Sequence, residues 1–445
     1  MSRSYDRRRF LGEALTASAA FATAAKARAA EPDEASGEAS DSPAESIVLG
    51  VMGTGGRGTA LAKEFAQLRG ARVAYVCDAD ERRMADAAQA AASQQSLAPE
   101  QVRDFRRILD DGAVDALVIA APDHWHAPAA ILACAAKKHV YVEKPACHNP
   151  HEAELLVEAA GRFERVVQHG TQRRSSPSVI AAIERVQQGE LGEVRFARGW
   201  INSQRPNIGR GKKTVPPEWL DWNLWQGPAP DREFQDNYVH YNWHWFWHWG
   251  TGELGNNGVH ALDLCRWGLG VGLPDRVVCG GGKLFFDDDQ QTPDTQIATF
   301  VFGRPETPDD RVEKAIHWEH RTWHRRGFEQ ETFGVQFYGD RGSLIITSNK
   351  YRQLDMQGAE LASGSVDRGE FEHLEDFLAA VRTGSSPNAE IREGVDSTML
   401  CLLGNIAYRT GSTVDVDPAA RQIINNPAAS ELWQREYRPE WQPRV

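Results

Sequence analysis

The sequence predicts an α/β fold in which a doubly wound parallel sheet is followed by an α/β domain with a large, open and mostly antiparallel sheet. Two observations predict this order. Strand and helix patterns alternate over residues 47–170, as a parallel sheet with crossover helices requires. Over residues 171–418, runs of β-branched and aromatic residues replace that alternation, which is typical of antiparallel strands.

The expected elements follow in chain order. In the first domain we expect strands at residues 47–52, 72–77, 115–121, 139–142 and 166–169, and helices at residues 59–68, 81–92, 105–110, 127–137 and 150–162. In the second we expect strands at residues 194–201, 276–286, 296–302, 315–323, 332–338 and 343–347, and helices at residues 254–269, 371–382 and 391–410. Residues 419–445 are expected to form a C-terminal tail.

A glycine-rich turn of residues 53–58 joins the first strand to the first helix. In such a turn Gly53 permits the sharp change of direction, Gly55 lets the backbone approach a pyrophosphate, and Gly58 allows close helix packing. The N–H groups at the start of the helix attract the anion. Strand, turn and helix together predict a dinucleotide site in a Rossmann domain.

The second strand is followed by Asp78, about 20 residues beyond the glycines, where a carboxylate accepts hydrogen bonds from the ribose of NAD. The same carboxylate would repel the 2′-phosphate of NADP. NAD is therefore the expected cofactor. Arg82 and Arg83 lie close enough to bind a phosphate, which keeps NADP as the less favoured alternative.

An export signal precedes this domain. Residues 7–11 are mostly basic, residues 14–25 are weakly apolar, and Ala27-Arg28-Ala29 has the form of a cleavage site. Paired arginines followed by x-Phe-Leu, at Arg7 and Arg8, resemble the twin-arginine motif, whose pathway carries folded proteins. We therefore expect residues 1–29 to be a twin-arginine signal peptide and the mature protein to be periplasmic. Residues 30–46 lack Lys and Arg and are expected to be a disordered acidic linker.

Composition argues against several kinds of partner. The formal net charge of −12 disfavours nucleic acid and anionic membranes. No other stretch is long and apolar enough for membrane insertion of the mature protein. The six cysteines are scattered without a C-x-x-C pair, which favours free thiols over metal ligation, and we expect no metal.

The strand of residues 139–142 runs into Glu143-Lys144-Pro145. Ligands of open parallel sheets bind beyond the carboxyl ends of the strands, and Lys144 falls there. A lysine beside a nicotinamide can hydrogen-bond or deprotonate a substrate hydroxyl. The alternative is a solvated lysine at a strand end.

Asn256, His260 and Asp263 stand at i, i+4 and i+7 of an expected helix, so they share one face. Histidine titrates near neutrality and suits proton transfer. A single histidine on a partly apolar helix is as well explained by packing. The neighbouring amide and carboxylate favour a polar site.

Aromatic side chains crowd residues 219–249 and alternate with histidines. Aromatic rings cover the apolar faces of sugars, which indicates a carbohydrate site. Core packing or a subunit contact is the alternative, because tryptophan is also abundant at interfaces, and we expect the segment to serve both roles. Substrate contacts are expected from Trp243, His244, Trp245, Asp263, Gln172 and Arg173.

Together these motifs resemble the Gfo/Idh/MocA family, the relatives of glucose-fructose oxidoreductase and inositol dehydrogenase. The resemblance spans residues 47–418 and rests on the glycine turn, Glu143-Lys144-Pro145, Gly258-x-His260-x-x-Asp263 and the closing patterns at residues 373–377 and 405–408. It implies a Rossmann domain, then an α/β domain whose open sheet carries the substrate site and often the oligomer contact.

The resemblance also implies that Lys144 and His260 are the catalytic pair, with Asn256 beside them. Many dehydrogenases of the family have aspartate where this chain has Asn256. An amide cannot take a proton, so the work of a base falls to His260 or Lys144. Further cofactor contacts are expected from Gly56, Arg57, Pro122, His126 and Glu143.

The sequence therefore predicts an exported NAD-dependent oxidoreductase that acts on a CH–OH group of a sugar, glycoside or cyclitol. Two alternatives stay open. One is an NAD-dependent glycosidase that works by transient oxidation and elimination. The other is a non-catalytic sugar sensor with a structural nucleotide. We expect a homodimer or homotetramer that forms through the open sheet.

Overall fold

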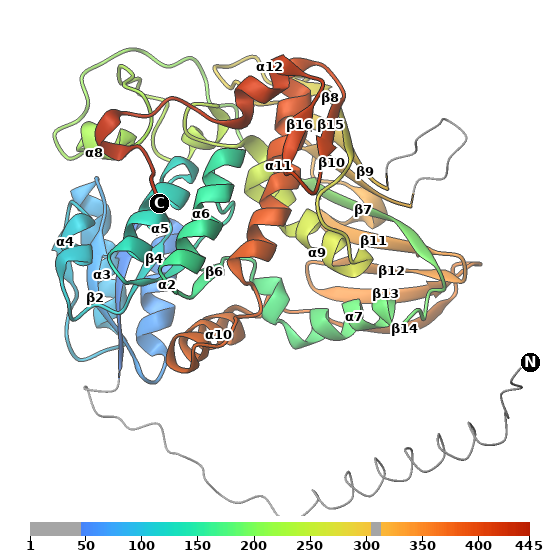
Figure 1. The fold of residues 1–445 in the computed structure, drawn as a ribbon, viewed down its shortest axis with the longest axis horizontal. Coiled ribbons are helices and arrows are strands. Elements are labelled where there is room, and N and C mark those ends of the chain that lie inside the picture. Colours follow the sequence, from blue (N-terminus) through green and yellow to red (C-terminus); the bar gives the residue numbers. More distant parts are fainter. Residues whose placement is uncertain (1–45, 304–312) are drawn as a thin grey trace, which may run out of the picture. The chain divides into compact units, whose positions relative to one another are not determined.

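The computed structural model describes residues 46–303 and 313–445. The expected signal peptide of residues 1–29 lies outside these ranges, as does the expected linker of residues 30–46 apart from its last residue. Two sheets follow one another along the described chain (Figure 1). None of the helices in these ranges is long and apolar enough to cross a membrane.

The first sheet has six parallel strands in the order β3-β2-β1-β4-β5-β6. They are β1 (Ile47–Met52), β2 (Ala71–Cys77), β3 (Glu100–Val102), β4 (Ala116–Ile119), β5 (His139–Val142) and β6 (Val167–His169). The helices are α2 (Gly56–Gln67), α3 (Glu81–Ala92), α4 (Arg106–Asp110), α5 (Asp123–Ala135) and α6 (Pro150–Arg162). The strand order reverses between β1 and β4, which predicts a ligand crevice beyond their carboxyl ends.

The second sheet has ten strands in the order β14-β13-β12-β11-β7-β10-β9-β8-β15-β16, and only the β7–β10 pair is parallel within the described sheet. They are β7 (Val194–Asn202), β8 (Arg276–Gly282), β9 (Thr295–Phe302), β10 (Lys314–Arg321), β11 (Phe333–Gly339), β12 (Gly342–Thr347), β13 (Lys350–Asp355), β14 (Glu360–Ser365), β15 (Val414–Asp417) and β16 (Gln422–Ile424). The fold class predicted from the sequence is therefore confirmed.

Helices cover one face of this second sheet (Figure 1). They are α7 (Pro177–Gln187), α9 (Val259–Leu269) and α11 (Ile391–Thr410). Trp318 and Phe337 point to this face and are fully buried. The opposite face is open, and Val278 and Ile297 on it are each 48% exposed.

A helix from late in the chain completes the first domain. This helix, α10 (Glu370–Thr383), places Leu374 and Phe377 in one core with Phe65 and Tyr141. The rings of Phe65 and Phe377 meet edge to face with centroids 6.1 Å apart. The two domains are thus joined by a shared core as well as by the chain.

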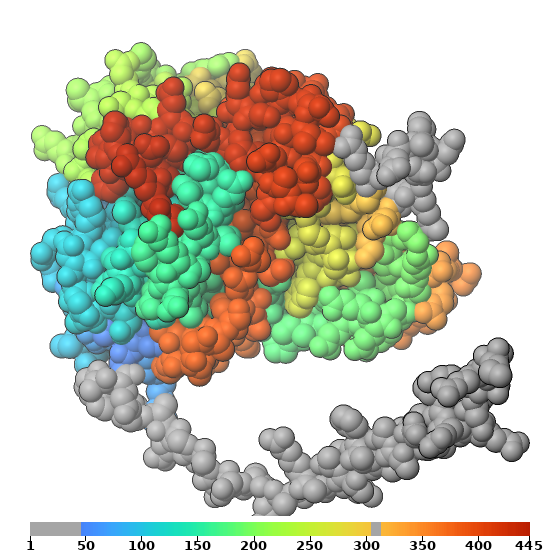
Figure 2. All heavy atoms as spheres, viewed as in Figure 1, coloured from blue at the N-terminus to red at the C-terminus, as the bar shows by residue number. Residues whose placement is uncertain are grey.

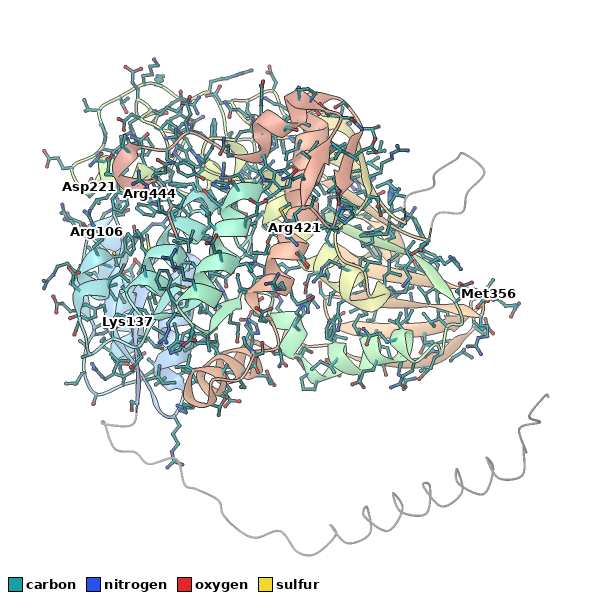
Figure 3. The ribbon with its side chains drawn as sticks, viewed as in Figure 1. Arg106, Lys137, Asp221, Met356, Arg421 and Arg444 are labelled. Atoms are coloured by element: carbon teal, nitrogen blue, oxygen red, sulfur yellow. The ribbon has the colours of Figure 1, made fainter. Side chains whose placement is uncertain are left out.

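The C-terminal segment also packs on the first domain. Figure 2 shows it in red against the teal helices α5 and α6. Trp441 is 6% exposed, and its ring lies 4.9 Å from that of Trp125. Arg421, labelled in Figure 3, forms a 2.8 Å ion pair with Asp396 of α11. Residues 419–445, expected as a tail, are therefore folded onto the molecule.

Several element boundaries differ from the prediction. Helices α2 and α5 begin three and four residues earlier than expected, because glycine and proline weaken the local helix signal there while tertiary contacts hold the turns. The strands β3, β13, β14, β15 and β16 were not expected. These strands lie at the sheet edges or next to them, where pairing with a neighbour holds them, and polar residues hide their alternation.

Candidate functional site

A cavity of about 670 Å³ lies where the carboxyl ends of β1, β4 and β5 meet the second domain. The glycine turn and Asp78 line one end of it. Lys144 and His260 line the other part of its wall. This is the crevice that the strand order predicts for a doubly wound sheet.

The glycine turn has the geometry that its residues demand. Gly53 has φ +84°, and a Cβ there would lie 2.3 Å from the Ala121 nitrogen. A Cβ on Gly58 would lie 1.7 Å from the Gly53 oxygen. Only glycine fits at either position without moving the backbone, so β1, β4 and α2 approach each other closely at this turn.

The first turn of α2 leaves room for an anion. The helix begins at Gly56 with no side chain capping it, so its first N–H groups lack partners from a cap. A Cβ built on Gly56 would have no atom of the described chain within 4 Å. Free N–H groups beside open space fit the pyrophosphate of a dinucleotide.

Asp78 closes the turn from the end of β2. Its Oδ2 accepts hydrogen bonds from the Thr54 nitrogen at 2.7 Å and Thr54 Oγ1 at 3.2 Å, and its Oδ1 accepts one from the Asp80 nitrogen at 2.9 Å. The carboxylate also lines the cavity. Each oxygen keeps acceptor capacity, so the residue fits a role on the ribose hydroxyls.

The two nearby arginines differ in direction. Arg82 stacks 3.4 Å over the ring of Trp219 and pairs with Asp80 at 2.9 Å. Arg83 lines the cavity, and a Cβ on Gly55 would lie 2.6 Å from its Nη1. Of the two arginines, Arg83 is the one placed to meet the adenosine end of a nucleotide.

Lys144 is held at the end of β5 by Asn256. The lysine Nζ donates to the Asn256 backbone oxygen at 2.7 Å and to its Oδ1 at 3.0 Å. The Asn256 amide nitrogen faces Glu253, whose Oε2 lies 3.4 Å away. Burial raises the pKa of Glu253. Two of the three Nζ donors are thus engaged, and the third is left for a ligand in the cavity.

His260 faces the same cavity from the start of α9, directly after a π-helical turn at Leu254–Gly258. Burial lowers the pKa of His260 well below its usual range, and the positive charges of Lys144 and Arg173 lower it further. The imidazole is therefore neutral near pH 7. A neutral ring can accept a proton that a cationic ring cannot.

An ion-pair cluster lies beneath this group. Arg57 Nε donates to Glu143 Oε1 at 2.7 Å, and its Nη2 donates to Glu370 Oε2 at 2.9 Å. Burial by itself would raise the pKa of Glu143, but the charges of Arg57 and Lys144 outweigh burial and lower it. Gln172 lies against the same pair. The cluster holds the chain directly after the carboxyl end of β5, where Lys144 lies.

His126 joins the ends of two strands. Its ring nitrogens lie 2.6 Å from the Pro145 oxygen and 2.7 Å from the Ala121 oxygen. Nearby, Asp123 Oδ2 accepts from Thr251 Oγ1 at 2.6 Å. These bonds fix β4 and β5 relative to each other and to the segment that leads into the π-helical turn.

The aromatic segment divides into two parts. Trp249 and Tyr238 belong to a buried cluster, which is core packing, and Trp225 belongs to the same cluster but also lines the cavity. Trp243 and His244 line the cavity, with their rings stacked at 3.6 Å between centroids. His244 Nδ1 donates to a backbone oxygen, and burial lowers its pKa to about 3, so the ring is neutral.

Tyr241 lies in the same wall in a strained conformation. Its φ is +77°, in a region that side chains other than glycine rarely adopt, and its side chain is 56% exposed. Residues held in such regions cluster at ligand sites. In the sequence, only its place in the aromatic segment marks this residue.

The cavity brings together most of the residues predicted from the sequence. Those that line it are Gly53, Gly55, Gly56, Arg57, Asp78, Pro122, His126, Glu143, Lys144, Gln172, Arg173, Trp243, His244, Asn256 and His260. Three others lie outside its wall. Gly58 acts through packing, and Trp245 is buried beneath Arg205, whose guanidinium carbon lies 3.5 Å from its ring centroid. Asp263 is bonded to Arg174 at 2.8 Å and to Ser397 at 2.6 Å.

Sequence reasoning missed the part of the wall that comes from the second sheet and its loops. These residues are Ile201, Thr332, Phe333, Ser348, Arg368 and Glu370. They follow no motif, because each is brought to the site by the register of a distant strand or by the entry to α10. Among the described residues, no group of three or more His, Cys, Asp or Glu side chains could hold a metal ion.

Comparison with known families decides the relationship. Residues 47–171 match the NAD-binding Rossmann fold of the Gfo/Idh/MocA oxidoreductase family. Residues 200–295 match that family's C-terminal alpha/beta domain. The chain belongs to the Gfo/Idh/MocA family. Its first domain is thus an NAD-binding Rossmann domain, and the glycine turn, open helix N-terminus and Asp78 fit that cofactor.

Two curated relatives of this Gfo/Idh/MocA chain are an inositol 2-dehydrogenase and a glycosyl hydrolase family 109 protein. The first, from Rubrobacter xylanophilus, is 35% identical over 158 residues, which is 35% of this chain and 44% of that protein. The second, from a Shewanella species, is 29% identical over 205 residues, 43% of this chain and 44% of that protein. The chain therefore covers less than half the length of these relatives.

A solved structure shares the Gfo/Idh/MocA fold over most of the chain. Levoglucosan dehydrogenase in complex with NADH and levoglucosan matches with a TM-score of 0.62 at 18% identity. The match covers 83% of this chain and 99% of that one. At this identity the likeness shows the fold alone.

Proposed function

We propose that the protein is an NAD-dependent oxidoreductase that acts on a CH–OH group of a sugar, glycoside or cyclitol. One observation carries this proposal. Lys144, fixed by Asn256, and the neutral His260 face one cavity with the glycine turn. The names of the relatives support the substrate class, since they include inositol and levoglucosan dehydrogenases.

The side chains divide the work at the reacting hydroxyl. When bound, NAD supplies a nicotinamide ring that accepts hydride from a carbinol carbon. The free N–H of Lys144 binds the substrate oxygen and stabilises its negative charge as the proton leaves. His260, being neutral, accepts that proton. Asn256 holds the lysine in place and takes no proton itself.

We propose NAD rather than NADP as the cofactor in use. Asp78 at the end of β2 lines the cavity and would repel a 2′-phosphate. Arg83 lines the same region and opposes this preference, whereas Arg82 is engaged with Trp219. We expect the Asp78 carboxylate to outweigh Arg83 in the choice of cofactor, because it is hydrogen-bonded directly to the glycine turn.

A second candidate function is an NAD-dependent glycosidase that oxidises its substrate transiently and returns the electrons. Several relatives carry the name glycosyl hydrolase family 109 protein, one of them 29% identical over 205 residues. The proton acceptor of this chain is a histidine beside an amide, which suits reversible proton transfer at one carbon as well as net oxidation.

The test has two measurements. Mass spectrometry of the denatured protein should reveal co-purified NAD. Nicotinamide absorbance is then followed with neutral sugars, sugar acids, cyclitols and aryl glycosides. Stoichiometric NADH supports the dehydrogenase, and a transient signal with release of the aryl group supports the glycosidase. No redox change with any of them would contradict both and favour the sugar sensor.

We also propose export and self-association. The twin-arginine pattern at Arg7 and Arg8 supports a periplasmic location, and replacing both by lysine should leave unprocessed protein in the cytoplasm. Val278 and Ile297 on the open sheet face support a homodimer or homotetramer through that face. Light scattering should give a smaller mass for Ile297→Asp than for the parent protein. An unchanged mass would contradict this interface.

A further inference from the structure

Two guanidinium groups line the cavity without an acidic partner. Arg173 lies in the 3-10 helix η2 (Gln172–Ser175) and is 7% exposed. Arg368 lies on the exposed loop between β14 and α10. Within the described chain, neither forms an ion pair within 4.0 Å. The hydrogen bond of the Arg173 side chain goes from Nη1 to the Thr347 oxygen at 3.5 Å.

The neighbouring arginines Arg174 and Arg57, in contrast, have acidic partners. Arg174 donates to both oxygens of Asp263 at 2.8 to 3.0 Å. Arg57 is bound by both Glu143 and Glu370. A buried charge that lacks a partner is costly, and proteins normally pair it. Arg173 instead rests on the Phe333 ring, 4.6 Å from its centroid, and turns its charge toward the cavity.

Both arginines act on the proposed reaction centre. Their charges contribute to the lowered pKa of His260, so they lie within electrostatic range of it. Burial and, to a smaller extent, the charge of Arg368 lower the pKa of Arg173 to about 10, while Asp367 and Glu370 oppose the shift.

Three cationic side chains line this end of the cavity. Glu64, Glu143 and Glu370 all lie within 4.0 Å of Arg57, so Arg57 is the cation that their charges meet. Lys144, Arg173 and Arg368 add three positive charges that meet no carboxylate within ion-pair distance in the described chain. An anion bound there would gain attraction from several sides in a partly desolvated site.

We propose that Arg173 and Arg368 bind an anionic group of the substrate, so that the enzyme acts on an acidic sugar rather than a neutral one. The proposal rests on the proposed function of the same cavity. A guanidinium presents parallel N–H donors that match carboxylate and phosphate oxygens. The shared chemistry is a carboxylate or phosphate located a few bonds from the carbinol carbon that Lys144 and His260 address.

Calorimetry on the NAD-loaded full-length mature protein tests the proposal. The probes are glucuronate and galacturonate, their methyl esters, and glucose 6-phosphate. The esters keep the ring hydroxyls, lose the charge and add one methyl group. At least one acid should bind about tenfold or more tightly than its ester. Comparing the affinity for glucose 6-phosphate with that for the two acids shows whether the site prefers a phosphate or a carboxylate.

Variants connect the preference to the two residues. Arg368→Gln is at an exposed position and should fold, and Arg173→Met removes the buried charge. Each should reduce acid binding about tenfold and leave ester binding unchanged. Arg392→Gln, an exposed arginine outside the cavity wall, is the matched control and should change neither.

The outcomes separate this proposal from the function it rests on. Equal binding of acid and ester, no binding of any acid, or equal loss of both in the variants overturns the anion site. Reduction of bound NAD by neutral sugars alone also overturns it, while the oxidoreductase function stands. Acid binding that depends on the arginines, without any change in nicotinamide absorbance, supports the anion site and contradicts the function.

Discussion

The two ends of the cavity are built in different ways. The main features of the nucleotide end come from one short stretch of chain, since Asp78 lies only 25 residues after Gly53. This end works through the shape of the backbone. The other end combines Lys144, Arg173, His260 and Arg368, which are spread over more than 200 residues of the sequence. It works through charged and polar side chains. Substitutions that add bulk should therefore impair nucleotide binding at the first end. Substitutions that remove a charge with little change of shape should impair the second end.

The largest effect is expected from Gly53→Ala. The new Cβ would lie 2.3 Å from the Ala121 nitrogen, at φ +84°. NAD affinity should fall roughly 10³-fold by calorimetry, because the turn must move away from the pyrophosphate. Gly161→Ala is the control, since its Cβ would meet no atom of the described chain within 4 Å. Normal NAD binding by Gly53→Ala would mean that the turn does not shape the nucleotide end.

Lys144→Met should have the next largest effect, on turnover rather than on the nucleotide. Loss of the Nζ donor should reduce kcat by about 10² or more, the usual effect of losing a donor to a developing negative charge. NAD affinity should stay within about twofold of the parent value, because the glycine turn is untouched. Lys63→Met, an exposed lysine on α2, is the control. A parallel loss of NAD binding and turnover would show that the two ends are not separable.

Glu143→Gln tests the ion-pair cluster between the ends. The substitution leaves Arg57 with one carboxylate fewer in a buried site, where Glu143 is 4% exposed. The free energy of unfolding should fall by about 3 kcal/mol, measured by urea unfolding. Glu158→Gln on the exposed side of α6 should change it by less than about 0.5 kcal/mol. Equal stabilities would show that the cluster does not support the site.

Asp78→Ala should have a smaller and selective effect. Removing the carboxylate should weaken NAD about tenfold and leave NADP unchanged or tighter, since the repulsion of the 2′-phosphate is lost. Calorimetry measures the affinity for both cofactors on the same variant, so NADP serves as the control for NAD. An equal loss for both cofactors would mean that Asp78 only braces the turn through its bonds to Thr54.

The smallest expected effect is that of pH on turnover. Burial and the charges of Lys144, Arg173 and Arg368 lower the pKa of His260, so the ring stays neutral as pH falls below the ordinary value of about 6.5. The kcat/KM profile should therefore be flat from about pH 8 to 6 and decline only in more acidic solution. A half-maximal rate near pH 6.5 would contradict a depressed His260 pKa.

The sequence predicts the nucleotide end better than the other end, for a physical reason. A backbone site needs particular residues at fixed spacing, so the glycine turn and Asp78 are visible in the sequence. Arg368 and Phe333 reach the cavity through strand register and a loop, which leave no local pattern. The helical face predicted for Asn256, His260 and Asp263 is interrupted by a π-helical turn, and Asp263 turns instead to Arg174.

The central claim is that Lys144 and His260 act on a substrate held against NAD in this cavity. Stopped-flow absorbance of the nicotinamide, on NAD-loaded protein mixed with sugars and sugar acids, tests it most directly. We expect a rise in the parent protein and a rise at least about a hundredfold slower in Lys144→Met with its NAD retained. No rise with any of these compounds, or the same rate in the variant, would contradict the account.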